Sequence, residues 1–119
     1  MKDKMTFKRF IGGAASAALL VAASAFSATA EERITRLADL DPDYEFYPLP
    51  PGEGVEDTYF ACVACHSLRT VTNGGYSRRV WDELLDWMVE DQGMMEPEPE
   101  VREIMLEYLT TYIGEDWEG

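Results

Sequence analysis

Both cysteines of the chain and its only histidine lie within five residues, in the sequence CVACH at Cys62, Cys65 and His66. Two thiols three positions apart on one helical turn point the same way, so both can add to the vinyl groups of a haem. The histidine that follows directly is placed so that its imidazole can reach the haem iron. This spacing is the c-type haem attachment motif, and it predicts one covalently bound haem c per chain.

Other uses of the two thiols fit the sequence less well. A structural disulfide is open to any cysteine pair in an oxidising compartment. A thioredoxin-like redox pair needs a βαβ setting, and no strand pattern surrounds the motif. A structural zinc site needs four nitrogen or sulfur ligands, whereas this chain offers at most three. The residues therefore favour haem attachment.

Residues 1–30 have the pattern of a secretory signal peptide. A basic start precedes an apolar stretch from Phe10 to Phe26, and the small residues Ala28 and Ala30 follow as a cleavage pattern. We predict cleavage after Ala30 and a periplasmic location, which agrees with the motif because haem of this type is attached outside the cytoplasm. The alternative is a retained membrane anchor, since the apolar stretch is at the short limit for a membrane span.

Charge restricts the partners of the remaining chain. Removal of thirty residues from the 119 leaves 89, which carry 22 acidic side chains, six arginines and no lysine. About sixteen net negative charges exclude binding to nucleic acid or to an anionic membrane surface. They favour a basic protein partner. The alternative is a solvated acidic surface that has no partner.

The sequence predicts one small all-α domain. A chain of 89 residues has a marginal core, so a covalent or metal-bound group is expected to stabilise it. Prolines and glycines in residues 31–54 predict an extended arm, and residues 115–119 read as an acidic tail. Residues 55–114 form the predicted haem domain, with helices at about 55–68, 78–92 and 99–113. The second helix begins after Ser77, a good N-cap, and three- and four-residue steps relate its apolar side chains. They are Trp81, Leu84, Leu85 and Met88.

The sequence also suggests roles for the aromatic residues of the arm, for the residues that line the haem pocket and for three arginines. The aromatic residues of the arm, Tyr44, Phe46 and Tyr47, either cover the haem edge or a partner, or pack on their own domain. The expected pocket lining is Tyr59, Phe60, Trp81, Leu85 and Leu109. The candidates for pairing with the haem propionates are Arg69, Arg78 and Arg79, and the alternative for each is a surface ion pair.

The second axial ligand must be a methionine if the iron is six-coordinate. His66 is the only histidine and no lysine follows residue 30, which leaves the Met/His pair of many cytochromes c. Met105 lies among core positions and reads as packing. Met88, on the apolar face of the second helix, and Met94, in the loop after Gly93, remain as candidates. Either could instead fill a gap in the core.

The runs CVACHS, SRRVWDELLDWMV and QGM together resemble the cytochrome subunit of periplasmic sulfite dehydrogenases (sulfite:cytochrome c oxidoreductases). The resemblance covers about Gly52 to Gly114 and implies a cytochrome c-like domain. In that family a molybdopterin subunit oxidises sulfite. The small haem subunit takes up electrons one at a time and passes them to a soluble cytochrome c, which for this acidic chain would be a basic one.

Carried over to this chain, the resemblance gives Cys62 and Cys65 the haem thioethers and His66 the iron. It favours Met88 as the second ligand, because similar small haem domains have a methionine there. Met94 has the loop position of the ligand in class I cytochromes c, but the usual following proline is missing. The chain has no catalytic residue of its own, so it is expected to transfer electrons. The alternatives are a diffusible cytochrome for another dehydrogenase, and a haem sensor or peroxidase-like protein with a labile sixth ligand.

Overall fold

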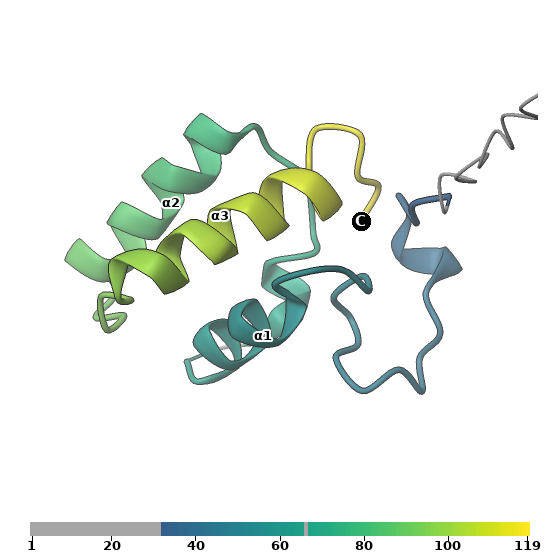
Figure 1. Ribbon diagram of the computed structural model, residues 1–119, viewed down its shortest axis with the longest axis horizontal. Coiled ribbons are helices and arrows are strands. Elements are labelled where there is room, and N and C mark those ends of the chain that lie inside the picture. Colours follow the sequence, from purple (N-terminus) through teal and green to yellow (C-terminus); the bar gives the residue numbers. More distant parts are fainter. Residues whose placement is uncertain (1–31, 66) are drawn as a thin grey trace, which may run out of the picture. The chain divides into compact units, whose positions relative to one another are not determined.

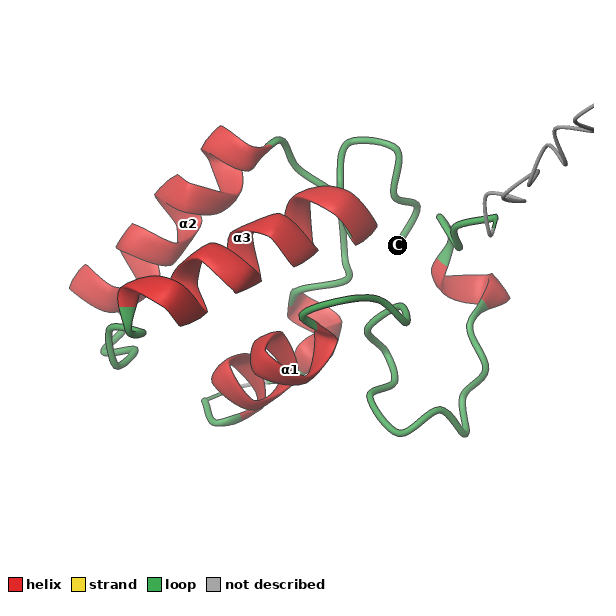
Figure 2. Cartoon of the chain, viewed as in Figure 1, coloured by secondary structure: helices red, strands yellow, loops and turns green. Residues whose placement is uncertain are grey.

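The computed structural model describes residues 32–65 and 67–119; the predicted signal peptide and His66 lie outside the described residues. The described part contains three α-helices and no β-strand (Figures 1 and 2). They are α1 (Val55–Val63), α2 (Arg78–Glu90) and α3 (Pro99–Tyr112). The predicted all-α fold is therefore confirmed. No helix among these residues has the length and apolar character needed to cross a membrane.

Helix α3 forms the centre of the fold, because it packs against both α1 and α2 (Figure 1). Pro99 occupies its first turn, where a missing N–H costs nothing. Its buried face carries Met105, Leu106, Tyr108 and Leu109. Met105 is fully buried, in agreement with its expected packing role.

Helix α2 begins where its sequence predicts. The hydroxyl of Ser77 accepts a hydrogen bond from the N–H of Val80 (3.5 Å), which satisfies one free donor of the first turn. The helix ends at Glu90, two residues before the predicted end. Gly93 then takes a positive φ of 73°, a conformation that glycine adopts without strain. The chain folds back there, and the N–H of Met94 donates to the carbonyl of Met88 (2.9 Å).

Helix α1 is shorter than expected, since it ends at Val63 and not near Leu68. A separate 3₁₀ turn follows at Leu68–Thr70. The hydroxyl of Ser67 accepts a hydrogen bond from the N–H of Arg69 (3.3 Å) at the start of this turn. A serine side chain that bonds to nearby backbone favours a turn over α-helix, which suits the start of a separate 3₁₀ turn at this position.

The segment before α1 is folded, in contrast to the expected extended arm. It contains a 3₁₀ turn at Leu37–Asp39 followed by further turns, and it buries Leu40 and Leu49. The hydroxyl of Tyr108 in α3 donates to the carbonyl of Pro50 (2.6 Å). Burial of the two leucines stabilises this arrangement, so the alternative of packing on its own domain is the one observed.

Residues 115–119 also differ from the expected acidic tail. Trp117 is only 5% exposed, and its indole N–H donates to the carbonyl of Thr72 (3.0 Å). Backbone hydrogen bonds join Glu118 to Thr35 (2.8 Å) and Leu37 (2.9 Å) in the segment before α1. The acidic composition of these five residues predicted an exposed tail, but the single tryptophan among them is buried and holds this end of the chain against the domain.

The loop between α1 and α2 crosses the chain after α3 at Gly75. A Cβ atom at this position would lie 1.7 Å from the carbonyl oxygen of Gly114 and 2.7 Å from Cβ of Trp117. The N–H of Tyr76 donates to the carbonyl of Ile113 beside this crossing (3.2 Å). Only glycine therefore fits at the crossing, which fixes the loop that leads from the cysteine motif into α2.

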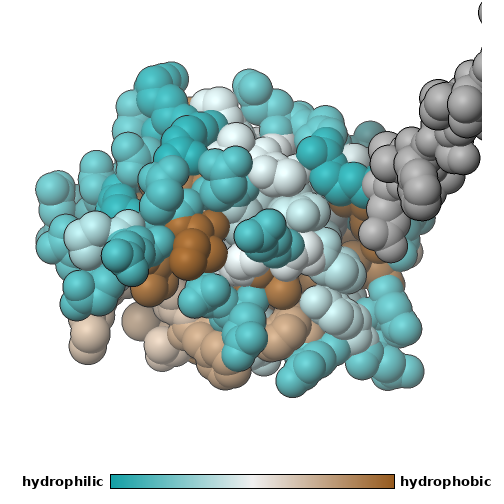
Figure 3. All heavy atoms as spheres, viewed as in Figure 1, coloured by the Kyte–Doolittle hydropathy of each residue, from teal (hydrophilic) through white to brown (hydrophobic). Residues whose placement is uncertain are grey.

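Most of the surface seen in Figure 3 is hydrophilic, with hydrophobic side chains gathered over α1 and part of α3.

Ion pairs join α2 to α3 on this acidic molecule. Arg102 of α3 binds Asp82 (2.6 Å) and Asp86 (2.7 Å) of α2. Hydrogen bonds to these carboxylates, with their negative charges, raise the pKa of Arg102 and keep it protonated.

Candidate cofactor site

A cavity of about 560 Å³ lies between the cysteine motif and α2. Its lining comes from the end of α1, the following loop, α2 and the loop after α2. The lining residues are Ala61, Cys62, Cys65, Thr70, Val71, Tyr76, Trp81, Leu84, Trp87, Met88, Gln92 and Met94. The volume lies within the range of small-molecule and cofactor sites, and the lining is mostly apolar and aromatic.

The two cysteines enter the cavity from different environments. Cys62 lies on the last turn of α1 and is buried, whereas Cys65 follows the helix and is exposed. Both are free thiols. Burial raises the pKa of Cys62 to about 11, with a smaller contribution from Cys65. The first thiol is thus protonated at neutral pH. His66, the third residue of the motif, lies outside the described residues.

The opposite wall is formed by α2, whose apolar positions point at the cavity as one face. Trp81 is 4% exposed, and its indole N–H donates to the carbonyl of Ile113 (3.0 Å). The ring of Tyr76 meets that of Trp81 edge-on, with centroids 5.1 Å apart. These contacts lock the indole, so this wall is rigid at its centre.

Both candidate methionines line the cavity. Met88 is on the last full turn of α2, and the hydrogen bond from the N–H of Met94 to the carbonyl of Met88 brings the loop back to the same place. Both side chains are half-buried. Met95 is 87% exposed, so of the two consecutive methionines Met94 lines the cavity and Met95 does not. The choice between Met88 and Met94 stays open.

Of the residues expected to form the pocket wall, Trp81 lines the cavity and the others do not. Leu85 and Leu109 are fully buried in the core. Tyr59 and Phe60 pack with Phe46 of the preceding segment, with ring centroids 5.3 and 6.5 Å from it. Phe60, two residues before Cys62, faces away from the cavity as the helical period requires, whereas Tyr59 is held by its aromatic contact with Phe46.

Tyr76 and Trp87 were not expected in the lining. Trp87 lies three residues after Leu84 and one before Met88, so the helical period that relates Trp81, Leu84 and Met88 could have included it. Tyr76 belongs to a loop, where no periodicity applies. Its place follows from the glycine crossing before it.

Two of the three candidate arginines are already paired with acids. Arg78 binds Glu103 (2.7 Å) and Glu107 (3.1 Å), and Arg79 binds Glu83 (2.6 Å). Across residues 32–65 and 67–119, Arg69 is the arginine that forms no ion pair. It is exposed and lies four residues after Cys65.

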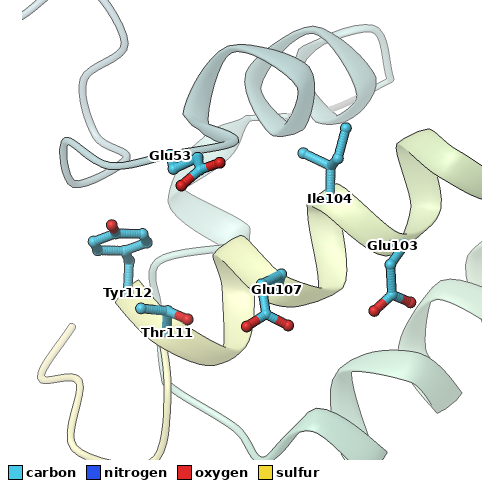
Figure 4. A pocket seen from close by; sticks show the side chains of 6 residues that line it. All are labelled: Glu53, Glu103, Ile104, Glu107, Thr111 and Tyr112. Carbon is cyan, nitrogen blue, oxygen red and sulfur yellow. The ribbon is translucent and has the colours of Figure 1, made fainter.

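A second hollow, of about 460 Å³, has a different character (Figure 4). It lies along α3, which supplies all but one of its lining residues. They are Glu53, Glu103, Ile104, Glu107, Thr111 and Tyr112. Glu53 reaches it from the loop before α1 (Figure 4). This acidic groove contains no sulfur ligand.

Comparison of the chain with protein-family models, with curated proteins and with solved structures gave no match in any of the three.

Proposed function

We propose that the chain is a periplasmic c-type cytochrome with one haem, which carries single electrons as the electron-accepting subunit of a molybdenum-dependent sulfite dehydrogenase. The observation that supports it best is the convergence of Cys62, Cys65, Met88 and Met94 on one cavity. The first two belong to a c-type attachment motif, and the other two are the methionines that the sequence offers as iron ligands.

The chemistry of this lining fits a haem. Thiols that face an apolar cavity can form thioethers with vinyl groups, and a thioether sulfur is a ligand of haem iron in cytochromes c. The aromatic walls at Tyr76, Trp81 and Trp87 suit a flat apolar macrocycle. A haem bound there would supply one-electron oxidation and reduction at its iron.

Each residue then has a definite task. Cys62 and Cys65 would hold the group covalently, and His66 and one methionine, Met88 or Met94, would ligate its iron. Trp81, fixed by Ile113, excludes water from one side, and exclusion of water tunes the reduction potential. Arg69 is the arginine left to pair with a propionate, because Arg78 and Arg79 have acidic partners.

The role in sulfite oxidation rests on the resemblance of residues 52–114 to the cytochrome subunits of that family. The chain has no catalytic group beyond the proposed haem ligands, so a partner that contains molybdopterin would oxidise the substrate. A basic soluble cytochrome c would take the electrons away, since the acidic surface attracts such a partner.

The haem and its ligation are tested on the purified holoprotein. We expect thioether-bound haem, and in the oxidised protein the absorption band of sulfur bound to iron. A haem without this band that rapidly binds carbon monoxide when reduced would overturn electron transfer in favour of a sensor or peroxidase-like protein. A protein without haem would overturn the whole proposal.

The proposed role of the chain in sulfite oxidation is tested by native purification from the cells that produce the protein. Haem absorbance identifies the fractions that contain it, and sulfite is added to the final fraction. We expect it to copurify with a larger chain that contains molybdenum, and sulfite to reduce the haem. A haem protein that arrives alone and stays oxidised with sulfite would be a diffusible carrier for another donor.

A further inference from the structure

One aromatic residue belongs both to the cavity wall and to the outer surface. Trp87 lines the cavity, yet it is 50% exposed. Its neighbour on the wall, Trp81, is almost completely buried, so exposure is not a property of the wall as a whole. A large exposed indole forgoes the free energy of burial, and tryptophan is the residue most enriched at the centres of protein interfaces.

Two acidic side chains without an ion pair to any described residue lie beside this indole. Glu90 and Asp91 follow Trp87 by three and four residues, which places them beside it on the same side of α2. Both are exposed, and neither forms an ion pair within the described part of the chain. By contrast, Glu83, one turn before Trp87, is neutralised by Arg79.

The acidic residues on the other side of α2 are already in ion pairs. Asp82 and Asp86 both bind Arg102 of α3. The acidic residues here without an ion pair among the described residues, Glu90 and Asp91, therefore lie at the C-terminal end of α2, beside Trp87. We call Trp87, Glu90 and Asp91 together the Trp87 face.

We infer that the Trp87 face is the docking surface for a basic electron-carrier protein. This inference rests on the proposed function, since it takes the cavity behind Trp87 to hold the redox group. An apolar centre with unpaired acids beside it complements a partner with lysines or arginines around an apolar contact. The indole then belongs both to the cavity wall and to the surface that meets the partner. One electron leaves the reduced protein and reduces one oxidised partner, with no proton transferred.

A second exposed aromatic residue provides a matched control. Phe60 is 60% exposed, and Glu56 and Asp57 lie one turn before it on α1. These two acids also lack an ion pair among the described residues. Phe60 does not line the cavity. The two faces thus have similar charge and aromatic character but differ in access to the proposed haem.

The test compares two double variants of the holoprotein, Glu90→Gln with Asp91→Asn and Glu56→Gln with Asp57→Asn. Each removes two negative charges, and none of these residues lines the cavity. The probe is an oxidised, lysine-rich soluble cytochrome c, and the quantity is the second-order rate of its reduction at several salt concentrations. We expect the first pair to slow the reaction about five-fold at low salt and to flatten its salt dependence, and the second pair to change it less than two-fold.

Equal slowing by both pairs would overturn the inference, because attraction would then depend on net charge alone. Greater slowing by the Glu56 and Asp57 pair would assign docking to α1. The haem spectrum and reduction potential of each variant are measured first. If the unsubstituted protein itself carried no haem, the proposed function would fail before docking was examined.

Discussion

The cavity at the cysteine motif and the acidic groove along α3 have similar volumes, about 560 and 460 Å³, but different linings. Sulfur atoms and aromatic rings face the first. Carboxylates face the second, and two of them, Glu103 and Glu107, already bind Arg78. The comparison shows that the donor atoms of a hollow, more than its size, decide which ligand it can take.

The two hollows also differ in how their walls are built. The cavity draws on residues 61–94 and takes none from α3, whereas the groove is formed by α3 and Glu53 alone. Substitutions can therefore change one hollow and leave the other as a control. The following predictions test whether the two are as independent as their linings suggest.

The largest effect is expected from Cys65→Ser. It removes one of the two thiols that the cavity offers, and the small apo-domain has too little core to fold well without a covalent cofactor. We expect little or no mature holoprotein, measured as haem per protein after export. Glu107→Gln in the groove should leave haem content unchanged. Normal haem content in Cys65→Ser would contradict attachment through both thiols.

The next effect is expected from Met88→Ala and Met94→Ala, compared side by side. Both side chains line the cavity, but only one could complete the coordination of the proposed haem iron. We expect one variant to lose the sulfur-to-iron absorption band and to bind carbon monoxide, while the other keeps the band. Met105→Leu is the control, because this methionine packs in the core. If both variants kept the band, neither methionine would be required, or each could replace the other.

A smaller effect is expected from Tyr108→Phe, which acts on the segment leading to Glu53 and the groove. Loss of the hydrogen bond to Pro50 should lower the free energy of unfolding by about 1 kcal/mol. Burial raises the pKa of Tyr108 far above its ordinary value of 10.0. The native protein thus keeps this proton where the unfolded chain loses it, and the stability that depends on it falls as the pH rises above about 10.

The difference between Tyr108→Phe and the unsubstituted protein should therefore shrink between about pH 10 and pH 11, measured by denaturant unfolding. A difference that does not change with pH would mean that Tyr108 titrates in the folded protein as it does in the unfolded chain.

The smallest effect is expected from Arg78→Gln, which removes the α2 partner of two groove carboxylates, Glu103 and Glu107. Its two ion pairs join α2 to α3 but are solvent-exposed, so their loss should cost about 0.5 to 1 kcal/mol. The cost should decrease at high salt, and haem content should not change. A loss of haem in this variant would show that the two hollows depend on each other.

The helices that pack through a regular apolar face were predictable. Ser77 and the repeat of Trp81, Leu84 and Met88 located α2 to within two residues of its end. The end of α1 at Val63 and the separate 3₁₀ turn capped by the hydroxyl of Ser67 were not predicted. Helical periodicity contains no signal for such a local cap.

The ends of the described chain were predicted least well, since they are held by contacts between residues far apart in sequence. Trp117 bonds to Thr72, and Glu118 bonds to Thr35 and Leu37. Proline, glycine and acidic residues suggested an arm and a tail, but composition does not show which single apolar residues are buried. Both candidate methionines were named from the sequence; that they share one cavity was not.

The position of the tryptophans has an optical consequence. Of the three in the chain, Trp81 and Trp87 line the cavity, and Trp117 is buried near Thr72. An excited indole transfers its energy efficiently to a strongly absorbing group in contact with it. Emission from Trp81 and Trp87 should therefore be almost dark when a haem fills the cavity and bright when it is empty. If the proposed haem binds there, these two tryptophans would report its loading by fluorescence without any added label.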